Sequence, residues 1–185
     1  MTPPAAATPA ASLGVEVLER FSGRDLADLC RATRDTAIEG TDSSFGGAPT
    51  EVRLAAFWKG VALAPHRTLI ICRLDGVIAG ALQLVRPSPL TEAGPYVADL
   101  ETFFVAPWAR GHGLAPLMVE KAEEVARAKG IRILDVSTRA SRRRAIEVFE
   151  ALGYARWAEK EHYAFIDGKF VPGLYLSKRL DGQPS

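Results

Sequence analysis

Two carboxylate side chains, Asp99 and Glu101, stand two positions apart at the start of an apolar segment. The segment ends in Phe103, Phe104 and Val105, bulky residues that suit a buried strand. Alternate residues of a strand point to the same face, so we expect both carboxylates on one side of a sheet. A carboxylate there can take a proton from a reacting group, directly or through water. The pair is a candidate general base, and the alternative is a structural ion pair near the end of the sheet.

A glycine-rich turn follows this strand. Pro107 ends the strand because it has no backbone donor for a sheet ladder, and apolar residues recur at helical spacing from Leu114 until Gly130 stops the helix. The first N–H groups of a helix lack intrahelical partners and, with the helix dipole, bind phosphate. Gly111 and Gly113 carry no side chain that would hold a phosphate away. The turn predicts a phosphate site, and the alternative is that its glycines only permit the turn.

The spacing around this turn is also that of a known motif. Arg110, Gly113 and Ala115 form the pattern Arg-x-x-Gly-x-Ala after Val-x-Pro. This pattern resembles motif A of the GNAT acyltransferase superfamily, whose loop cradles the pyrophosphate of coenzyme A. The resemblance covers, more loosely, about residues 15 to 180.

Two narrower resemblances lie within that span. The run Leu-Glu-Thr-Phe-Phe-Val at 100–105 is similar to the corresponding strand of the polyamine (spermidine/spermine) N-acetyltransferases. Residues 39–46 and the run Ala-Phe-Trp at 56–58 are similar to a segment of the tabtoxin-resistance acetyltransferases. Because this region covers the acceptor in the superfamily, Phe45 and Trp58 are expected to border the acceptor pocket, and the alternative for Trp58 is a core position.

An acyl transfer from a thioester to an amine needs a held donor, a deprotonated nucleophile and a stabilised oxyanion. The resemblance implies acetyl-CoA as the cosubstrate and no metal. It also implies that the strand at 103–105 binds the pantetheine arm and that the N–H of Val105 polarises the acetyl carbonyl. Glu101 matches the acid of the polyamine enzymes and is the base that we favour, while Asp99 matches the acid of histone-type and tabtoxin-type relatives. The residues expected to hold acetyl-CoA are Phe103, Phe104, Val105, Arg110, Gly111, His112, Gly113, Leu114, Ala115, Arg142 and Phe149.

The chain departs from the superfamily pattern at a later helix. Phe149 stands where many relatives carry a tyrosine that protonates the leaving thiolate, so water or another residue such as Tyr154 must serve. Arg142 stands where relatives carry an asparagine. The run Arg142 to Arg144 falls in the first turn of the expected helix, where positive charge opposes the helix dipole by roughly 0.3–1 kcal/mol per residue. The 3′-phosphate of coenzyme A would explain this run, and a solvated basic face is the alternative.

Composition limits the other classes of function. With 185 residues and 48% hydrophobic content, the chain suits one domain, which we place at 13–181 after a disordered Pro/Ala-rich tail at 1–12. Twenty-three basic and 22 acidic residues leave a net charge of +1, so no bulk attraction to nucleic acid or an anionic membrane is expected. Cys30 and Cys72 show no metal-binding or disulfide spacing, which favours a reducing cytoplasm. We see neither an apolar run near the ~18 residues of a membrane span nor a signal peptide.

The order of apolar patterns predicts an α/β fold. Asp75-Gly76 and Asp167-Gly168 are strong hairpin signals, and loops are expected at 41–49 and 86–95. By resemblance, the fold is the GNAT-like N-acyltransferase fold, a mixed, mostly antiparallel sheet with helices on both faces and splayed central strands. The expected strands are at 15–17, 68–74, 77–85, 99–105, 131–136, 154–165 and 170–180, and the expected helices are at 26–39, 51–61, 114–129 and 141–152.

The function that these features favour is transfer of an acetyl group from acetyl-CoA to a primary amine, by direct attack within a ternary complex. The acceptor classes that stay open are a polyamine, an amino-acid-like molecule or a toxin. A protein lysine or N-terminus is an alternative acceptor, and a non-catalytic acyl-CoA-binding regulatory domain is the alternative that Phe149 supports. Because many relatives are dimers, the resemblance allows a homodimer.

Overall fold

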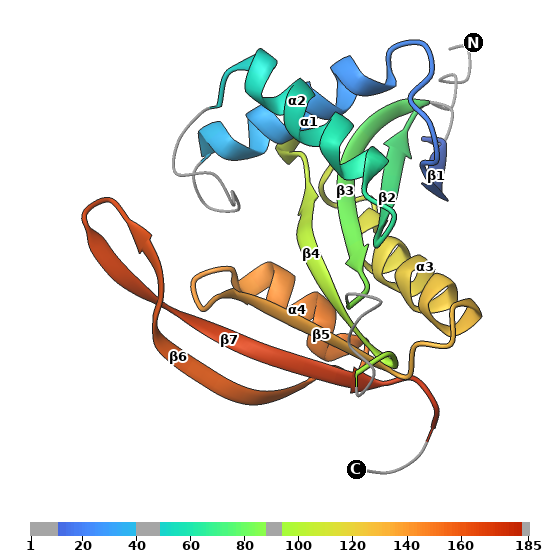
Figure 1. Ribbon diagram of the computed structural model, residues 1–185. Coiled ribbons are helices and arrows are strands. Elements are labelled where there is room, and N and C mark those ends of the chain that lie inside the picture. The colour runs from blue at the N-terminus through green and yellow to red at the C-terminus, as the bar shows by residue number, and fades with distance from the viewer. Residues whose placement is uncertain (1–10, 40–48, 88–93, 183–185) are drawn as a thin grey trace, which may run out of the picture.

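The computed structural model describes residues 11–39, 49–87 and 94–182. Within these residues seven strands form a single sheet in the order β1-β2-β3-β4-β5-β7-β6, and all neighbours are antiparallel except β4 and β5 (Figure 1). The strands are β1 (Leu13–Val17), β2 (Arg67–Leu74), β3 (Val77–Val85), β4 (Val97–Val105), β5 (Ile133–Arg139), β6 (Ala155–Ile166) and β7 (Lys169–Arg179). The helices are α1 (Asp25–Glu39), α2 (Glu51–Leu63), α3 (Leu114–Ala128) and α4 (Arg143–Ala151), with a short 3₁₀ turn at Pro107–Ala109.

Local sequence accounts for most of these elements. Asp75 and Gly76 both have positive φ angles, 50° and 80°, as do Asp167 and Gly168, at 49° and 78°. Two successive positive φ values match the right-handed twist of the flanking strands, so both predicted hairpins are confirmed. Thr50 caps α2 by accepting a hydrogen bond from the N–H of Arg53 at 3.3 Å.

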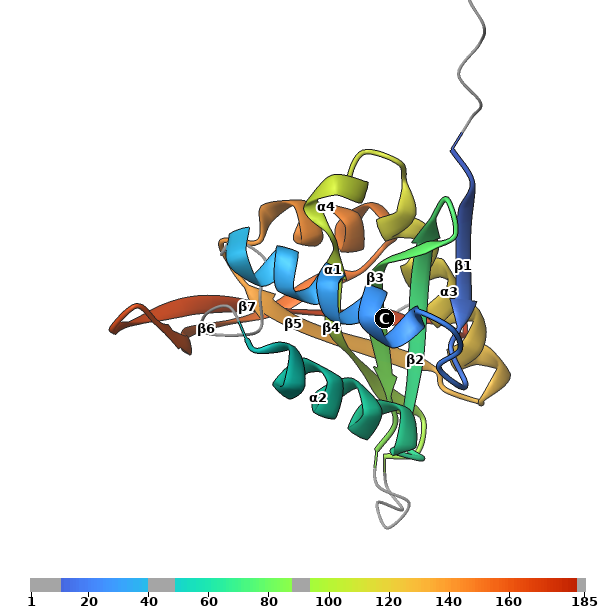
Figure 2. The same cartoon turned by 90° about the horizontal axis from the view of Figure 1, so that it is seen from above.

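The helices cover both faces of the sheet, and Figure 2 shows α2 and α4 on opposite sides of it. One apolar cluster packs α1 and α2 onto β2 to β4 and includes Trp58 and Phe104, while the other packs α3 and α4 on the opposite face and includes Met118 and Phe149. Trp58 is fully buried, and its indole N–H donates to the Thr33 hydroxyl at 3.0 Å. Trp58 is therefore a core residue.

Some boundaries differ from the sequence expectation. β5 begins at Ile133 and not at residue 131, because the N–H of Ile131 still bonds to the carbonyl of Ala126 at the end of α3. α4 begins at Arg143, with Arg142 as its N-cap, and not at Ser141. Residues 1–10 of the tail predicted at 1–12, most of the loops at 41–49 and 86–95, and the predicted pocket residue Phe45 lie outside the described residues.

The centre of the sheet is open, as predicted. Residues 97–100 of β4 pair with residues 133–136 of β5, and no further pairing between the two strands follows in the described sheet. The register of β4 against β3 shifts between Ala81 and Gln83, and Thr102 of β4 takes a positive φ of 52°. This bulge turns β4 away from β5, and Figure 1 shows the two strands diverging.

Candidate active site

Two cavities lie along the open part of β4. The first, which we call the loop groove, has a volume of about 390 Å³. It is lined by Phe103, Phe104, Val105, Ala109, Arg110, Gly111, Gly113, Leu114, Ala115, Pro116, Arg142, Arg144, Ala145 and Val148. The second, which we call the splay cavity, has a volume of about 430 Å³. It is lined by Leu100, Glu101, Thr102, Phe103, Val136, Ser137, Thr138, Arg139, Arg142, Ala145, Phe149, Tyr163, Ala164 and Ile166.

The loop groove ends at the N-terminus of α3. Gly111 and Gly113 have positive φ angles of 83° and 76°, and a Cβ built on either would meet no atom within 4 Å. The glycines therefore permit the turn and also leave open space in front of the helix. Gly113 is the N-cap of α3 and provides no side-chain cap, so the helix amides face this space with their hydrogen-bonding capacity available to a ligand. His112, which the sequence interpretation placed with the cofactor, is not among the residues that line the groove. Its Nδ1 lies 3.2 Å from the carbonyl oxygens of Ala109 and Arg110.

Arg110 is held in place on two sides. Its Nε donates to the carbonyl of Val105 at 3.2 Å, and its guanidinium pairs with Glu39 at the end of α1 at 2.7 Å. Nearby, the indole of Trp108 donates to Asp35 of α1 at 3.1 Å. The loop that follows β4 is thus fastened to α1 as well as to β4.

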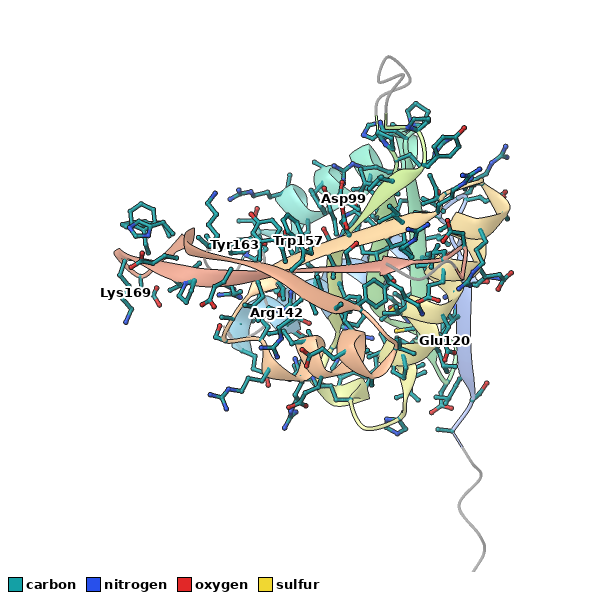
Figure 3. The ribbon with its side chains drawn as sticks, turned by 90° about the horizontal axis from the view of Figure 1, so that it is seen from below. Asp99, Glu120, Arg142, Trp157, Tyr163 and Lys169 are labelled. Carbon is teal, nitrogen blue, oxygen red and sulfur yellow. The ribbon has the colours of Figure 1, made fainter. Side chains whose placement is uncertain are left out.

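Arg142 lies where the two cavities meet. Its Nη2 donates to the carbonyl of Phe103 at 2.7 Å, so the side chain reaches from the start of α4 to the open edge of β4. In Figure 3 it lies on the side of the sheet that carries α4. The sequence left the arginine run either at an anion site or on a solvated face. The structure directs Arg142 inward, and its neighbour Arg144 also lines the loop groove.

Glu101 belongs to a polar network and also lines the splay cavity. Its Oε2 accepts from Arg67 Nη1 at 2.7 Å, and Arg67 Nη1 also donates to Gln83 at 2.6 Å. Gln83, fully buried, donates in turn to the hydroxyl of Thr102 at the bulge, at 2.9 Å. The carboxylate of Glu101 therefore forms an ion pair and also faces a cavity, and its role as a general base stays a prediction.

Asp99 stands next to other acids. It pairs in register with Asp135 of β5 and does not line the splay cavity. Desolvation by the surrounding protein and the charges of Asp135 and Glu101 raise the pKa of Asp99. A carboxylic acid with a raised pKa beside a candidate site is a stronger base than an ordinary one, so Asp99 stays a second candidate for the base.

The raised pKa of Asp99 also predicts a pH-dependent stability effect. Below the ordinary value of 3.8 the carboxyl is protonated in both the folded and the unfolded protein and changes nothing. As the pH rises from 3.8 through the higher folded pKa, the unfolded chain loses the proton first, so the folded state is progressively destabilised. Asp99→Asn should therefore raise the melting temperature at pH 7 and leave it unchanged near pH 3. An equal shift at both pH values, measured by thermal denaturation, would contradict this explanation.

The structure does not support Tyr154 as the proton donor for a leaving thiolate. Tyr154 is 3% exposed, lines neither cavity, and packs its ring against Phe149 at 5.1 Å. Burial and the nearby Glu123 raise the pKa of its phenol far above the ordinary value. Phe149, 1% exposed, contacts Phe103 on the other side. Water or a residue other than Tyr154 remains as the donor from the sequence expectation.

The splay cavity contains residues that the sequence interpretation missed. Ser137, Thr138 and Arg139 lie on the extension of β5, and Tyr163 reaches the cavity from β6. The hydroxyls of Tyr163 and Ser137 lie 3.1 Å apart. Tyr163 packs over Gly173, where a Cβ would lie 2.2 Å from its ring. The sequence alone does not show that Gly173 and Tyr163 face each other, because their pairing depends on the register of the two strands.

These residues fit the cosubstrate that the sequence implies. The exposed backbone of β4, the glycine turn and the start of α3 line one groove, and among the described residues no atom lies within 4 Å of a Cβ placed at Gly111 or Gly113. Phe103, Phe104, Val105, Arg110, Gly111, Gly113, Leu114, Ala115 and Arg142 are thereby brought together, while Phe149 lies on the side of the splay cavity. A groove of this kind, beside an opened parallel strand pair, defines an acyl-CoA-binding transferase fold.

Comparisons with known proteins agree. Residues 34–154 match the acetyltransferase (GNAT) family. An uncharacterized N-acetyltransferase of Azospirillum brasilense, from the hisH-hisA intergenic region, is 44% identical over 130 residues, which are 70% of this chain and 77% of that protein. The chain belongs to the acetyltransferase (GNAT) family, and it is an acetyltransferase with the acetyl-CoA-binding fold of that family.

Solved structures show the same fold. A GNAT-family acetyltransferase from Streptococcus pneumoniae superposes with a TM-score of 0.74 at 21% identity, over 91% of this chain and 99% of that one. A phosphinothricin acetyltransferase from Sinorhizobium meliloti, in complex with acetyl-CoA, gives a TM-score of 0.73 at 16% identity, over 92% and 89% of the two chains. The fold class expected from the sequence is confirmed.

None of the described helices combines the length and the apolar character that crossing a membrane requires. Within the same residues, His, Cys, Asp and Glu side chains form no group of three or more that could hold a metal ion.

Proposed function

We propose that the protein transfers the acetyl group of acetyl-CoA to the primary amine of a small molecule, by direct attack in a ternary complex. The observation that carries this proposal is the meeting of the two cavities at Phe103. The loop groove leads to that point from the glycine turn, and the splay cavity leads to it from the opposite side. A donor and an acceptor held in the two cavities would meet at the open edge of β4.

The chain's own residues supply the positioning. The amides of Gly113 to Ala115 face the site of a diphosphate, and the open backbone of β4 faces the site of the pantetheine arm. The N–H of Val105 is placed by resemblance to polarise a carbonyl. Acetyl-CoA supplies the acetyl group as a thioester: the amine nitrogen forms the amide bond as the C–S bond breaks, and the proton that the nitrogen then loses reaches the departing thiolate through water.

Glu101 is the residue that we propose removes the proton from the amine nucleophile. An alkylammonium has a pKa near that of lysine, about 10.4, so almost all of it is unreactive at neutral pH. Glu101, which lines the splay cavity, would attract the ammonium and take its proton, directly or through water. Arg67 holds the carboxylate in place through Oε2, which orients the candidate base.

The cysteines support direct attack over a covalent acyl-enzyme. Both cysteines of the chain are buried, and burial raises the pKa of the Cys72 thiol to about 12 and raises that of Cys30 as well. A thiol in that state is a poor nucleophile because only the thiolate attacks.

Release of free thiol from acetyl-CoA, measured with a panel of small amines and of peptides, tests the proposal. We expect turnover with at least one small amine, and a rise in melting temperature when acetyl-CoA alone is added. Turnover with peptides only would favour a protein acetyltransferase. Stabilisation by acetyl-CoA with no turnover for any acceptor would favour a non-catalytic acyl-CoA-binding domain.

A further inference from the structure

Phe149 leaves one part of the proposed reaction without a protein group. Its ring has no hydroxyl, and Tyr154 lines neither cavity, so neither side chain can donate a hydrogen bond to a departing thiolate in the splay cavity. A thiolate that forms beside aromatic side chains is poorly solvated, and a hydrogen bond to it is stronger there than in water. Another hydroxyl in the lining of the splay cavity is the protein group that can take this role.

Thr138 carries a hydroxyl of this lining that has no partner among the described residues. The side chain is 4% exposed, and its Oγ1 makes no hydrogen bond within that part of the chain. The other hydroxyls of the lining do have partners, since Thr102 accepts from Gln83 at 2.9 Å and the hydroxyls of Ser137 and Tyr163 lie 3.1 Å apart. A buried hydroxyl without a partner destabilises a fold, and a ligand that accepts its hydrogen bond in the cavity would remove that cost.

Thr138 faces the side of the sheet that carries α4. Side chains alternate along β5, and Val136, which shares the face of Thr138, belongs to the apolar cluster that packs α3 and α4. Phe103 and Phe149 belong to the same cluster and line the splay cavity with Thr138. Arg142 borders this wall too, and its Nη2 donates to the carbonyl of Phe103. The unpartnered hydroxyl therefore lies on the same wall as the ring of Phe149.

The position of Thr138 along β5 suits the thioester end of the donor. The last paired residues of β4 and β5 are Leu100 and Val136, and Thr138 lies two positions beyond them, where the strands diverge (Figure 1). A donor whose diphosphate lies at the glycine turn would run back along β4 from Val105 to Phe103, which lines both cavities. We expect its sulfur to lie near the point of divergence, and hence near Thr138.

We infer that the hydroxyl of Thr138 donates a hydrogen bond to the sulfur of the departing coenzyme A thiolate. The inference rests on the proposed function and adds a catalytic residue to it. As the amine nitrogen bonds to the acetyl carbon and the C–S bond breaks, the electron pair of that bond stays on the sulfur, and the hydrogen bond stabilises this charge. Thr138 keeps its own proton, because an alkyl hydroxyl is a much weaker acid than a thiol. The proton from the amine reaches the sulfur through water.

The acidity of the coenzyme A thiol in its complex with the protein tests this contact without an acceptor. The thiolate is followed by its ultraviolet absorbance as the pH rises, as the difference between the complex and the free protein. Thr138→Val has the shape of threonine and no hydroxyl, so it should raise the pKa of the bound thiol by about one unit. Thr138→Ser keeps the hydroxyl and should keep the wild-type value. The comparison is between variants, because burial of the thiol acts on all of them alike.

Stability and catalysis should respond to Thr138→Val in different ways. Loss of an unpartnered buried hydroxyl should raise the melting temperature of the free protein or leave it unchanged. Loss of a hydrogen bond to a charged group should slow acetyl transfer roughly 10- to 100-fold, measured in a single turnover with the best amine. The affinity for acetyl-CoA should change little, because sulfur becomes a good acceptor only as its charge develops.

Thr36→Val is the matched control. Thr36 is 2% exposed, and its hydroxyl donates to the carbonyl of Ala32 at 2.8 Å within α1. It lines neither cavity. This variant also removes a hydroxyl from a buried threonine, and it should keep both the thiol pKa of bound coenzyme A and the rate of acetyl transfer.

The outcomes separate the inference from the proposed function. Equal thiol pKa values in the wild type and Thr138→Val overturn the inference and leave the acetyltransferase intact, because the sulfur is then stabilised elsewhere. A lower melting temperature of Thr138→Val with an unchanged rate also overturns it, because the hydroxyl is then structural only. Thr138→Ala is the second variant and must show the same rise in thiol pKa if valine does not fold. Failure of the wild type to bind coenzyme A overturns the inference and the proposed function together.

Discussion

Gly80→Ala is expected to disrupt the open part of β4 and weaken acetyl-CoA binding at least about tenfold. Gly80 of β3 pairs with Val105, and a Cβ there would lie 2.3 Å from the Phe104 carbonyl oxygen and 3.1 Å from the Val105 Cα. These contacts are backbone atoms of the strand expected to bind the pantetheine arm, so β4 itself must shift. Overpacking of this kind costs roughly 1–3 kcal/mol of stability, measurable by thermal denaturation, with acetyl-CoA affinity measured by calorimetry.

Gly60→Ala is the matched control for this effect. Gly60 lies within α2, and a Cβ there would meet no atom within 4 Å. Alanine in a helix interior is favoured over glycine by roughly 0.5–1 kcal/mol, so this variant should gain stability and keep its acetyl-CoA affinity. If Gly80→Ala melts and binds acetyl-CoA like the wild type, the close approach of β3 is not what holds β4 in its binding position.

Glu101→Gln is expected to lower kcat by roughly 10²- to 10⁴-fold, the usual contribution of a general base. Glutamine keeps the size of the side chain and an oxygen for Arg67, so the fold and the affinity for acetyl-CoA should change little. Steady-state turnover with the best amine, together with acetyl-CoA affinity from calorimetry, measures the separation between catalysis and binding.

The dependence of kcat on pH provides a further test of Glu101 as the base. As the pH approaches about 10.4 the amine becomes free without help, so the deficit of Glu101→Gln should shrink from pH 7 toward pH 9.5. Asp99→Asn is the comparison: a loss in that variant with Glu101→Gln unaffected would assign the base to Asp99. An unaltered rate in both variants would remove both carboxylates from the catalytic step.

Contiguous sequence was enough for the features that depend on neighbouring residues. Both hairpin turns, the strand that ends near Pro107 and the glycine turn before Leu114 were predicted because backbone preference and side-chain periodicity act over a few residues. Most of the residues that the sequence proposed for donor binding lie in one strand and one loop between Phe103 and Ala115, and they line one groove. The base candidates followed from the same strand.

The cavity that we propose for the acceptor could be found only in the folded chain, because its parts come from distant segments. Arg67 reaches Glu101 across 34 positions, and Arg142 reaches Phe103 across 39. The register of β5 with β7 and of β6 with β7 brings Arg139 and Tyr163 to one cavity, and no local pattern encodes that register. The types of side chain and the turns are local properties of the chain. The net charge of a cavity depends on residues from several distant segments, and these come together only when the chain folds.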